Sequence, residues 1–253
     1  MRFLLLPLAA LACVAAQPAA ACSPVPGYRV PTNMELTADA DLILLATVTG
    51  GTPMDPSADG GLDSMRIDIQ PVAALKGDLA SAPTSLDIAL ATRRFALLSN
   101  PYELFGAHPL AYIGGCIRYM VPQGSRLLFF LDRQEQRWVP AGGAFSRWAE
   151  DVLADDAPWL AAVKFYLEVQ ALPESERFAA LAARRDELRK QPLDPVAQLL
   201  ADDLDRQLAG PNEPLRREFM PDADADEDED ADPAEAAARK AVEAAKEAAR
   251  NPD

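Results

Sequence analysis

The stretch "DLILLATVTG", residues 41–50, is a mostly apolar run rich in Leu, Ile, Val and Thr. The glycine pair Gly50 and Gly51 ends it, and a loop-like segment rich in Gly, Pro, Asp and Ser follows. Short apolar runs of this composition, bounded by glycine, are typical of buried strands. We therefore expect a buried strand here, with the core of the fold assembled around it.

Two further segments alternate between apolar and polar residues. The period of two predicts strands with one face toward a core, formed by Met65, Ile67 and Ile69 and then by Leu86, Ile88 and Leu90. Pro71 interrupts the first segment, and because proline cannot donate to a strand ladder, we expect an edge or a bulge there.

The middle of the chain adds more strand signals after an irregular part. Residues 93–112 follow neither a strand period nor a helix period, so we expect a long excursion with one helical turn. The segments 112–121 and 126–133 predict two strands joined by a tight turn at "PQGS", and "RWVPAG" predicts another short strand. Five or six short strands with turn signals predict a small closed or nearly closed barrel.

From Asp156 the pattern changes to helices. Asp156 with Pro158 predicts the start of a first helix. Asp194 with Pro195 predicts the start of a third, which Gly210 and Pro211 end. Between them Pro173 ends one helix and precedes another. The apolar stripes expected to face the core are Trp159, Val163, Tyr166 and Leu167, then Phe178, Leu181 and Leu188, and finally Val196, Leu199, Leu200, Leu204 and Leu208.

The C-terminal segment, residues 211–253, carries much of the charge. The chain has a formal net charge of −15, of which −8 falls in residues 212–253. The run "DADADEDEDAD" repels itself and stays solvated, which predicts an acidic disordered tail, with only a marginal helix near the end. The remaining body is mildly acidic, which argues against nucleic acid or an anionic membrane as its partner.

The N-terminal segment has the parts of an export signal. Arg2 is basic, residues 3–16 are mostly apolar, and Ala19 and Ala21 are small residues suited to a peptidase. Cleavage after Ala21 would leave Cys22 as the first residue of the mature chain. Cys22 could then be bridged, acylated as in a lipoprotein, or left as a free thiol. The first reading of an even cysteine pair in an oxidising compartment, Cys22 with Cys116, is a disulfide.

Residues that carry chemistry are sparse. The single histidine, His108 in "GAHPL", is accompanied by no nucleophile motif, HExxH motif or phosphate loop, so we expect a loop histidine and no catalytic residues. Asp222, Asp224 and Asp226 match the first spacings of a calcium loop, but Glu227 stands where that loop needs glycine. We expect no metal site and no cofactor.

Several short motifs, taken in order, resemble the netrin-like domain of tissue inhibitors of metalloproteinases. They are "CSPVP", "ADADLILLATVTG", "ALKGD", "GGCIRYMVPQGSRLLFFL" and "VPAGGAFSRW". The similarity covers roughly residues 22–150. It implies a five-stranded OB-like barrel, mainly β, which agrees with the strand count above.

The resemblance also assigns roles to residues near the mature N-terminus. Cys22 and Cys116 match one bridged pair of that family, whereas Pro24 and Ala144 stand where a second pair would be. Inhibitors of that family chelate a protease's catalytic zinc with the free α-amine and carbonyl of the N-terminal cysteine. The implied chelating N-terminus is therefore Cys22 and Ser23.

These observations predict an exported, non-enzymatic protein-binding module, in the periplasm, in the cell envelope or secreted. Its organisation would be a signal peptide at 1–21, a netrin-like OB-fold domain at 22–150, a helical appendage at 151–210 and the acidic tail at 211–253. The partner would be a protein, with a metalloprotease as the most specific candidate. The alternative is a lipid-anchored envelope protein with Cys22 acylated, in which case the membrane is also a partner.

Overall fold

The computed structural model describes residues 24–52, 65–91, 97–113 and 115–215. All of them belong to one compact unit, Met1–Leu215. The predicted signal peptide, Cys22, Ser23 and nearly all of the predicted tail lie outside the described residues.

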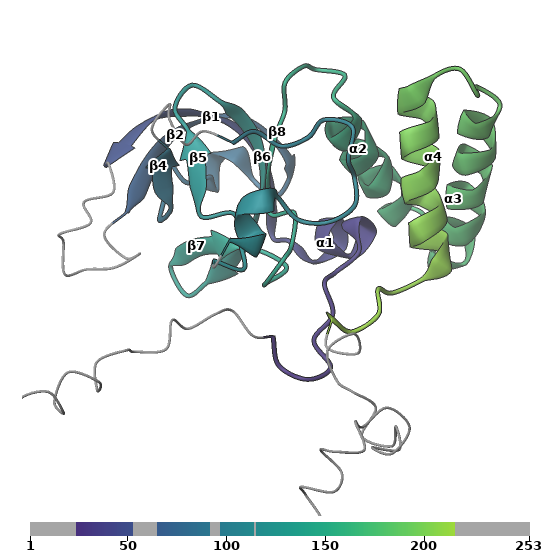
Figure 1. Cartoon of the computed structure of the whole chain (residues 1–253), viewed down its shortest axis with the longest axis horizontal. Helices are drawn as coiled ribbons and strands as arrows, with labels where there is room; N and C mark the ends of the chain where they lie inside the picture. Colours follow the sequence, from purple (N-terminus) through teal and green to yellow (C-terminus); the bar gives the residue numbers. More distant parts are fainter. Residues whose placement is uncertain (1–23, 53–64, 92–96, 114, 216–253) are drawn as a thin grey trace, which may run out of the picture. The chain divides into compact units, whose positions relative to one another are not determined.

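A mostly antiparallel sheet forms the N-terminal part of the unit (Figure 1). Its strand order is β3-β2-β1-β6-β7, and β8 pairs with β6 on the same side as β7. The strands are β1 (Leu42–Thr52), β2 (Arg66–Lys76), β3 (Ser85–Leu86), β6 (Arg126–Gln134), β7 (Arg137–Pro140) and β8 (Ala149–Asp151). No ladder between described strands joins the two ends of this path.

The predicted buried strand is confirmed as β1, which lies at the centre of the sheet between β2 and β6. Residues 42–46 are buried without interruption, and so are residues 127–131 of β6. In β6, Phe129 contacts Trp148 and its neighbour Phe130 contacts Trp159, so successive side chains find aromatic partners on opposite faces. Burial on both faces explains why both strands are continuous apolar runs.

The irregularity predicted at Pro71 is also confirmed. Leu45 lies opposite Ala73 whereas Ala46 lies opposite Pro71, so Val72 is an extra residue in β2. A bulge of this kind accommodates the missing amide proton of proline within a strand that is paired on both sides.

Two strand predictions were wrong in part. The segment with Leu86, Ile88 and Leu90 is split into β3 and β4 (Ala89–Ala91), because the Ile88 amide donates to Leu86 O at 3.0 Å and turns the chain. β4 then pairs in parallel with β5 (Met120–Pro122) in a separate two-stranded sheet.

The expected hairpin of 112–121 with 126–133 is therefore not formed. Cys116 has a φ of 58°, a left-handed conformation that interrupts an extended chain. A Cβ on Gly115 would lie 2.6 Å from Tyr119 Cδ1, so this close approach requires glycine. Of the strand predicted at 112–121, only β5 is formed. The residues just before β5 are not part of a strand, and Arg118 among them is buried in the interior.

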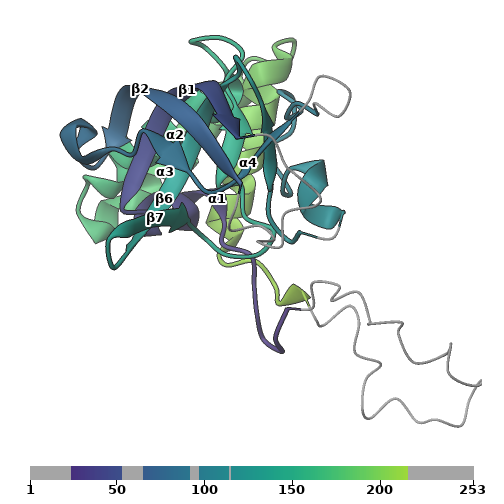
Figure 2. The ribbon, with the colours of Figure 1, turned by 90° about the vertical axis from the view of Figure 1, so that its left-hand side faces the viewer.

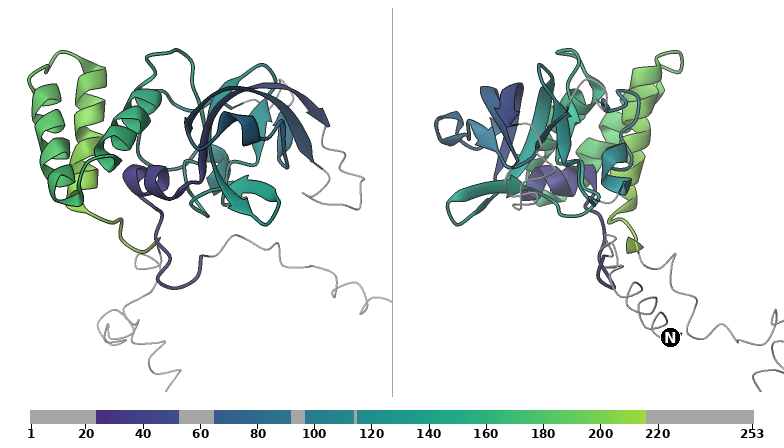
Figure 3. Two further views of the ribbon diagram at one scale, coloured as in Figure 1. Left: turned by 180° about the vertical axis from the view of Figure 1, so that it is seen from behind. Right: turned by 60° about the vertical axis from the view of Figure 1, so that its left-hand side comes forward.

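The α-helices among the described residues are α1 (Asn33–Asp39), α2 (Pro158–Gln170), α3 (Glu174–Arg189) and α4 (Pro195–Ala209). Figures 1 and 3 show α3 and α4 side by side, with α2 between this pair and the sheet. Figure 2 looks from the side of β1 and β2, with the helices behind. A single apolar core contains residues of β1, β6, α2 and α4.

The helix predictions are largely confirmed. The Asp194 side chain accepts from the amides of Val196 and Ala197 at the start of α4, and Gly210 ends that helix. Asp156 was the wrong cap, because α2 begins after Ala157, whose side chain cannot cap it. Phe178 was expected in the core but is 66% exposed.

Helix α1 was not predicted, although its N-terminal signal is present in the sequence. Thr32 and Glu35 form a reciprocal capping box, in which the Thr32 side chain accepts from the Glu35 amide and the Glu35 side chain accepts from the Thr32 amide. The helix has only seven residues, and a helix of that length leaves almost no periodicity to detect.

Candidate functional site

The structure describes only one residue of the predicted site. Cys116 is buried, and its carbonyl oxygen accepts a hydrogen bond from the Phe145 amide at 2.5 Å. The bridge from Cys116 to Cys22 stays a prediction, because Cys22 lies outside the described residues. The chain that follows Cys22 is nevertheless described from Pro24 onward.

This N-terminal segment, residues 24–31, is held against the loop 141–146. The Tyr28 hydroxyl lies 2.5 Å from Ala144 O and 3.1 Å from Gly142 O, so its single proton is shared between two carbonyl groups. Burial raises the pKa of Tyr28, which keeps the hydroxyl protonated as the donor. Residue 144, next to the Phe145–Cys116 contact, is thus tied directly to the N-terminal segment.

Two glycines allow this approach. Gly142 and Gly143 have φ values of 76° and 70°, in the left-handed region that favours glycine. A Cβ on Gly142 would lie 2.7 Å from Leu36 Cδ1, and one on Gly143 would lie 3.0 Å from the Tyr28 hydroxyl. Glycine is therefore favoured at both positions by the close approach of the loop to its neighbours.

The segment after α4 holds the N-terminal segment from another direction. The Leu215 amide donates to Tyr28 O at 3.0 Å, and the Asn212 side chain donates to Val30 O at 2.9 Å. Hydrogen bonds from the loop 141–146 and from the segment after α4 thus fix residues 28–30. Val25, earlier in the same segment, is 69% exposed.

Six of the twelve large apolar residues that are exposed among the described residues lie in the loop 97–113. Aromatic and aliphatic side chains point to solvent along it, each at least 41% exposed: Leu97, Leu98, Tyr102, Phe105, Tyr112 and Ile113. The Tyr112 ring stacks on Phe145 at 5.2 Å between centroids, which places this end of the loop beside Cys116 and the loop 141–146.

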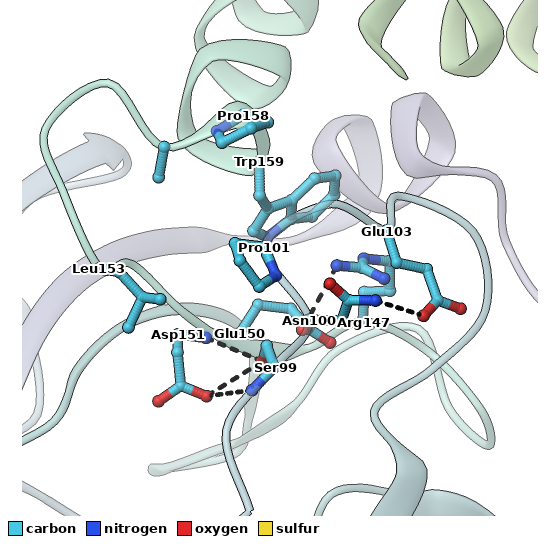
Figure 4. Close-up of a pocket in the computed structure, with 11 residues that line it drawn as sticks. Ser99, Asn100, Pro101, Glu103, Arg147, Glu150, Asp151, Leu153, Pro158 and Trp159 are labelled. Atoms are coloured by element: carbon cyan, nitrogen blue, oxygen red, sulfur yellow. Dashed lines mark hydrogen bonds and ion pairs between the residues drawn. The ribbon is translucent and has the colours of Figure 1, made fainter. Parts of the chain in front are cut away.

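A buried ionic cluster fixes the start of the loop. Arg118 and Asp151 form an ion pair at 2.8 Å with both side chains 1% exposed. The same Asp151 oxygen accepts from the Ser99 amide and hydroxyl, and Arg118 donates to Leu97 O. Figure 4 shows Ser99 of the loop hydrogen-bonded to Asp151. Separating Arg118 from Asp151 would leave a buried charge unpaired, which costs free energy. Both side chains therefore stay in place, and their hydrogen bonds hold residues 97–99.

His108 fixes the far end of the loop. Its Nδ1 accepts from the Leu110 amide at the start of the 3-10 helix η4 (Pro109–Tyr112), and its Nε2 lies 3.2 Å from Leu97 O. One acceptor and one donor correspond to a neutral ring. Burial, and then the nearby charge of Arg118, lowers the pKa of His108 to about 4. Both ring nitrogens are therefore used for structure.

The middle of the loop is held by two further bonds. Asn33 donates to Leu104 O, and Arg147 donates to Gly106 O. Asn33 also donates to Asp203, a fully buried carboxylate that accepts from Tyr166 as well. Burial raises the pKa of Asp203. These bonds connect the loop to α1, α2 and α4.

Sequence reasoning missed the residues that build this region, Tyr28, Ser99, Arg118 and Asp151. The detectable signal was Arg118, a charged residue inside the apolar segment "CIRYMV". A charge at such a position needs a buried partner, but nothing in the sequence names Asp151 as that partner.

Within the described residues, no group of three or more His, Cys, Asp or Glu side chains is placed to hold a metal ion. No described helix combines the length and apolar content needed to cross a bilayer. Comparison of the chain with protein-family models, curated proteins and solved structures finds no match.

Proposed function

We propose that the chain is an exported, non-enzymatic module that binds another protein. Its binding face would combine the N-terminal segment, residues 24–31, with the apolar loop 97–113. The observation that carries the proposal is that large apolar side chains are exposed on a loop whose backbone is fixed by buried polar bonds.

Fixed exposed aromatic residues favour binding for an energetic reason. A flexible loop loses conformational entropy when it is ordered by a partner, whereas a loop held in place beforehand retains more of the contact energy as affinity. Tyrosine is also enriched among the residues that dominate protein interfaces. Tyr102 and Tyr112, 66% and 61% exposed, fit that role.

The more specific version of the proposal is an OB-like barrel of the netrin type that inhibits a metalloprotease. It is supported by the arrangement around Cys116, where Phe145, Ala144 and Tyr28 form a chain of contacts to the N-terminal segment. A bridged Cys22 with a free α-amine would then stand at the edge of the binding face. One residue added before Cys22 should abolish inhibition of a target metalloprotease, and unchanged inhibition would exclude zinc chelation.

A lipid-anchored envelope protein is the second candidate. It rests on the small residues before Cys22, which suit a lipoprotein signal, and it is distinguished by partitioning of the exported protein into detergent.

The binding proposal is tested by capture from the exported fraction of the producing cells. The immobilised mature chain should retain one partner in a stoichiometric amount. The double variant Tyr102→Ser and Ile113→Ser should lose it, because these side chains are 66% and 65% exposed in the loop.

The matched control is the double variant Phe178→Ser and Leu193→Ser, which removes exposed apolar side chains from the helical region. It should capture the partner as the wild type does. Capture that survives the loop variant, or is lost equally in the control, would exclude this binding face.

A further inference from the structure

A small cavity lies between the sheet, the loop 97–113 and the first turn of α2 (Figure 4). Its volume is about 10 Å³, which is the space needed by the centre of one water molecule. Its walls include Ser99 and Pro101 from the loop, Glu150 and Asp151 from β8, and Trp159 from α2.

Among the residues that the structure describes, four buried side-chain atoms lack a hydrogen-bond partner, and all four belong to residues that line this cavity. They are Arg147 Nε, Glu150 Oε1, Asp151 Oδ1 and Trp159 Nε1. Each side chain is more than nine-tenths buried. Buried polar groups in folded proteins are almost always bonded to protein or to ordered water.

The four atoms divide into two donors and two acceptors. Arg147 Nε and Trp159 Nε1 each carry a proton, whereas the two carboxylate oxygens can only accept. Asp151 follows Glu150 in β8, so their side chains lie on opposite faces of the strand, and in Figure 4 the free oxygen of Asp151 is turned away from Glu150 and Trp159. Three atoms remain for one occupant. A water molecule complements them with an O–H donor for Glu150 Oε1 and two lone pairs for the N–H groups.

Charge argues against an ion at this position. The opposite oxygens of the two carboxylates are already paired, Glu150 with Arg147 at 3.3 Å and Asp151 with Arg118 at 2.8 Å. The cluster is therefore balanced, with two positive and two negative side chains. A cation would face the two N–H groups, an anion would face the Glu150 carboxylate, and a ligand with several non-hydrogen atoms would exceed the volume.

We propose that this cavity is a binding site for one water molecule, held by Arg147, Glu150 and Trp159. The water connects β8 to the first turn of α2, and so joins the sheet to the helices.

The test uses water-selective NOE and ROE spectra of the ¹⁵N-labelled full mature chain. The indole N–H of Trp159 should give a cross-peak to water whose NOE and ROE have opposite signs, which indicates direct contact with a long-lived water. Trp148 is the internal control, since it is also buried and its indole N–H donates to Arg118 O at 3.1 Å. The Trp148 indole N–H should give no such cross-peak. The indole resonances can be assigned in the wild-type protein, so the comparison needs no variant.

Three results would overturn the proposal. The first is no water cross-peak at Trp159, or an equal one at Trp148. The second is loss of the Trp159 cross-peak in Ser99→Ala, which would show that the signal was relayed from the Ser99 hydroxyl. The third is a change in the Trp159 indole shift when sodium chloride replaces choline chloride at equal ionic strength, which would identify the occupant as a cation.

Discussion

The Tyr28 hydroxyl lies 2.5 Å from the carbonyl oxygen of Ala144, and this bond links the N-terminal segment to the loop that also contacts Cys116. One phenolic proton thus positions the part of the chain where the binding face is proposed. Gly143 leaves the space that the Tyr28 ring needs, because a Cβ there would lie 3.0 Å from the hydroxyl oxygen.

Tyr28→Phe should lower the free energy of unfolding by about 1 kcal/mol, because it removes the donor and leaves two carbonyl groups without it. Urea unfolding at neutral pH measures the change. Tyr102→Phe is the control, since Tyr102 is 66% exposed, and its loss should stay within about 0.5 kcal/mol. Equal effects of the two variants would contradict the role given to Tyr28.

Gly142→Ala should destabilise the protein more than Gly124→Ala does. Both glycines have φ near 80°, so both substitutions carry the strain of the left-handed region, about 1 kcal/mol. Only at Gly142 would the new Cβ also lie within 2.7 Å of Leu36 and 2.9 Å of Ser146, whereas open space surrounds Gly124. Thermal unfolding compares the two variants, and equal losses would show that the loop can move away from α1 at little cost.

The low pKa of His108 predicts a loss of stability in acid. The ring is neutral in the folded protein down to about pH 4, whereas the unfolded chain binds its proton near pH 6.5. The unfolded state therefore binds more protons between these values, and stability falls as the pH is lowered from 6.5 to 4, by roughly 3 kcal/mol.

The variant His108→Asn separates this effect from the titration of carboxylates. Asparagine can still accept from the Leu110 amide but does not titrate, so the free energy of unfolding should change less across this pH range than in the wild type. Urea unfolding at several pH values measures it. The same pH dependence in both proteins would assign the acid loss to other groups.

Removing one partner of the buried ion pair should be costly. Arg118→Met leaves Asp151 charged and buried, and we expect a loss of about 3 to 5 kcal/mol in unfolding free energy. The double variant Arg118→Met with Asp151→Leu should recover part of it, because no buried charge remains. Asp155→Asn, at an exposed ion pair, is the control and should cost less than about 1 kcal/mol. A double variant as unstable as the single one would contradict this account.

The sequence predicts those elements whose signals are local. The run at 41–50, the bulge at Pro71 and the cap at Asp194 each depend on neighbouring residues alone, and each is confirmed. The predicted hairpin of 112–121 with 126–133 is not formed, because β5 pairs instead with β4, which lies about 30 residues earlier in the chain. Strand pairing of that kind depends on tertiary packing, which no short sequence window contains.

The candidate site is harder to predict from the sequence, because its contacts also depend on tertiary packing. Tyr28 and Ala144 are 116 positions apart, and Ser99 and Asp151 are 52 positions apart. Tyrosine, serine and aspartate are common residues, so only the folded chain identifies these pairs. Cys116 and the excursion that includes residues 97–112 were recognisable, but the bonds that hold the excursion in place were not.

The claim that the exported chain begins at Cys22 and is bridged to Cys116 is tested most directly by the intact mass of the exported protein, measured with and without reductant. The account predicts a chain of residues 22–253 that gains two hydrogens on reduction. A mass increased by acyl chains, or one that reduction leaves unchanged, would contradict it.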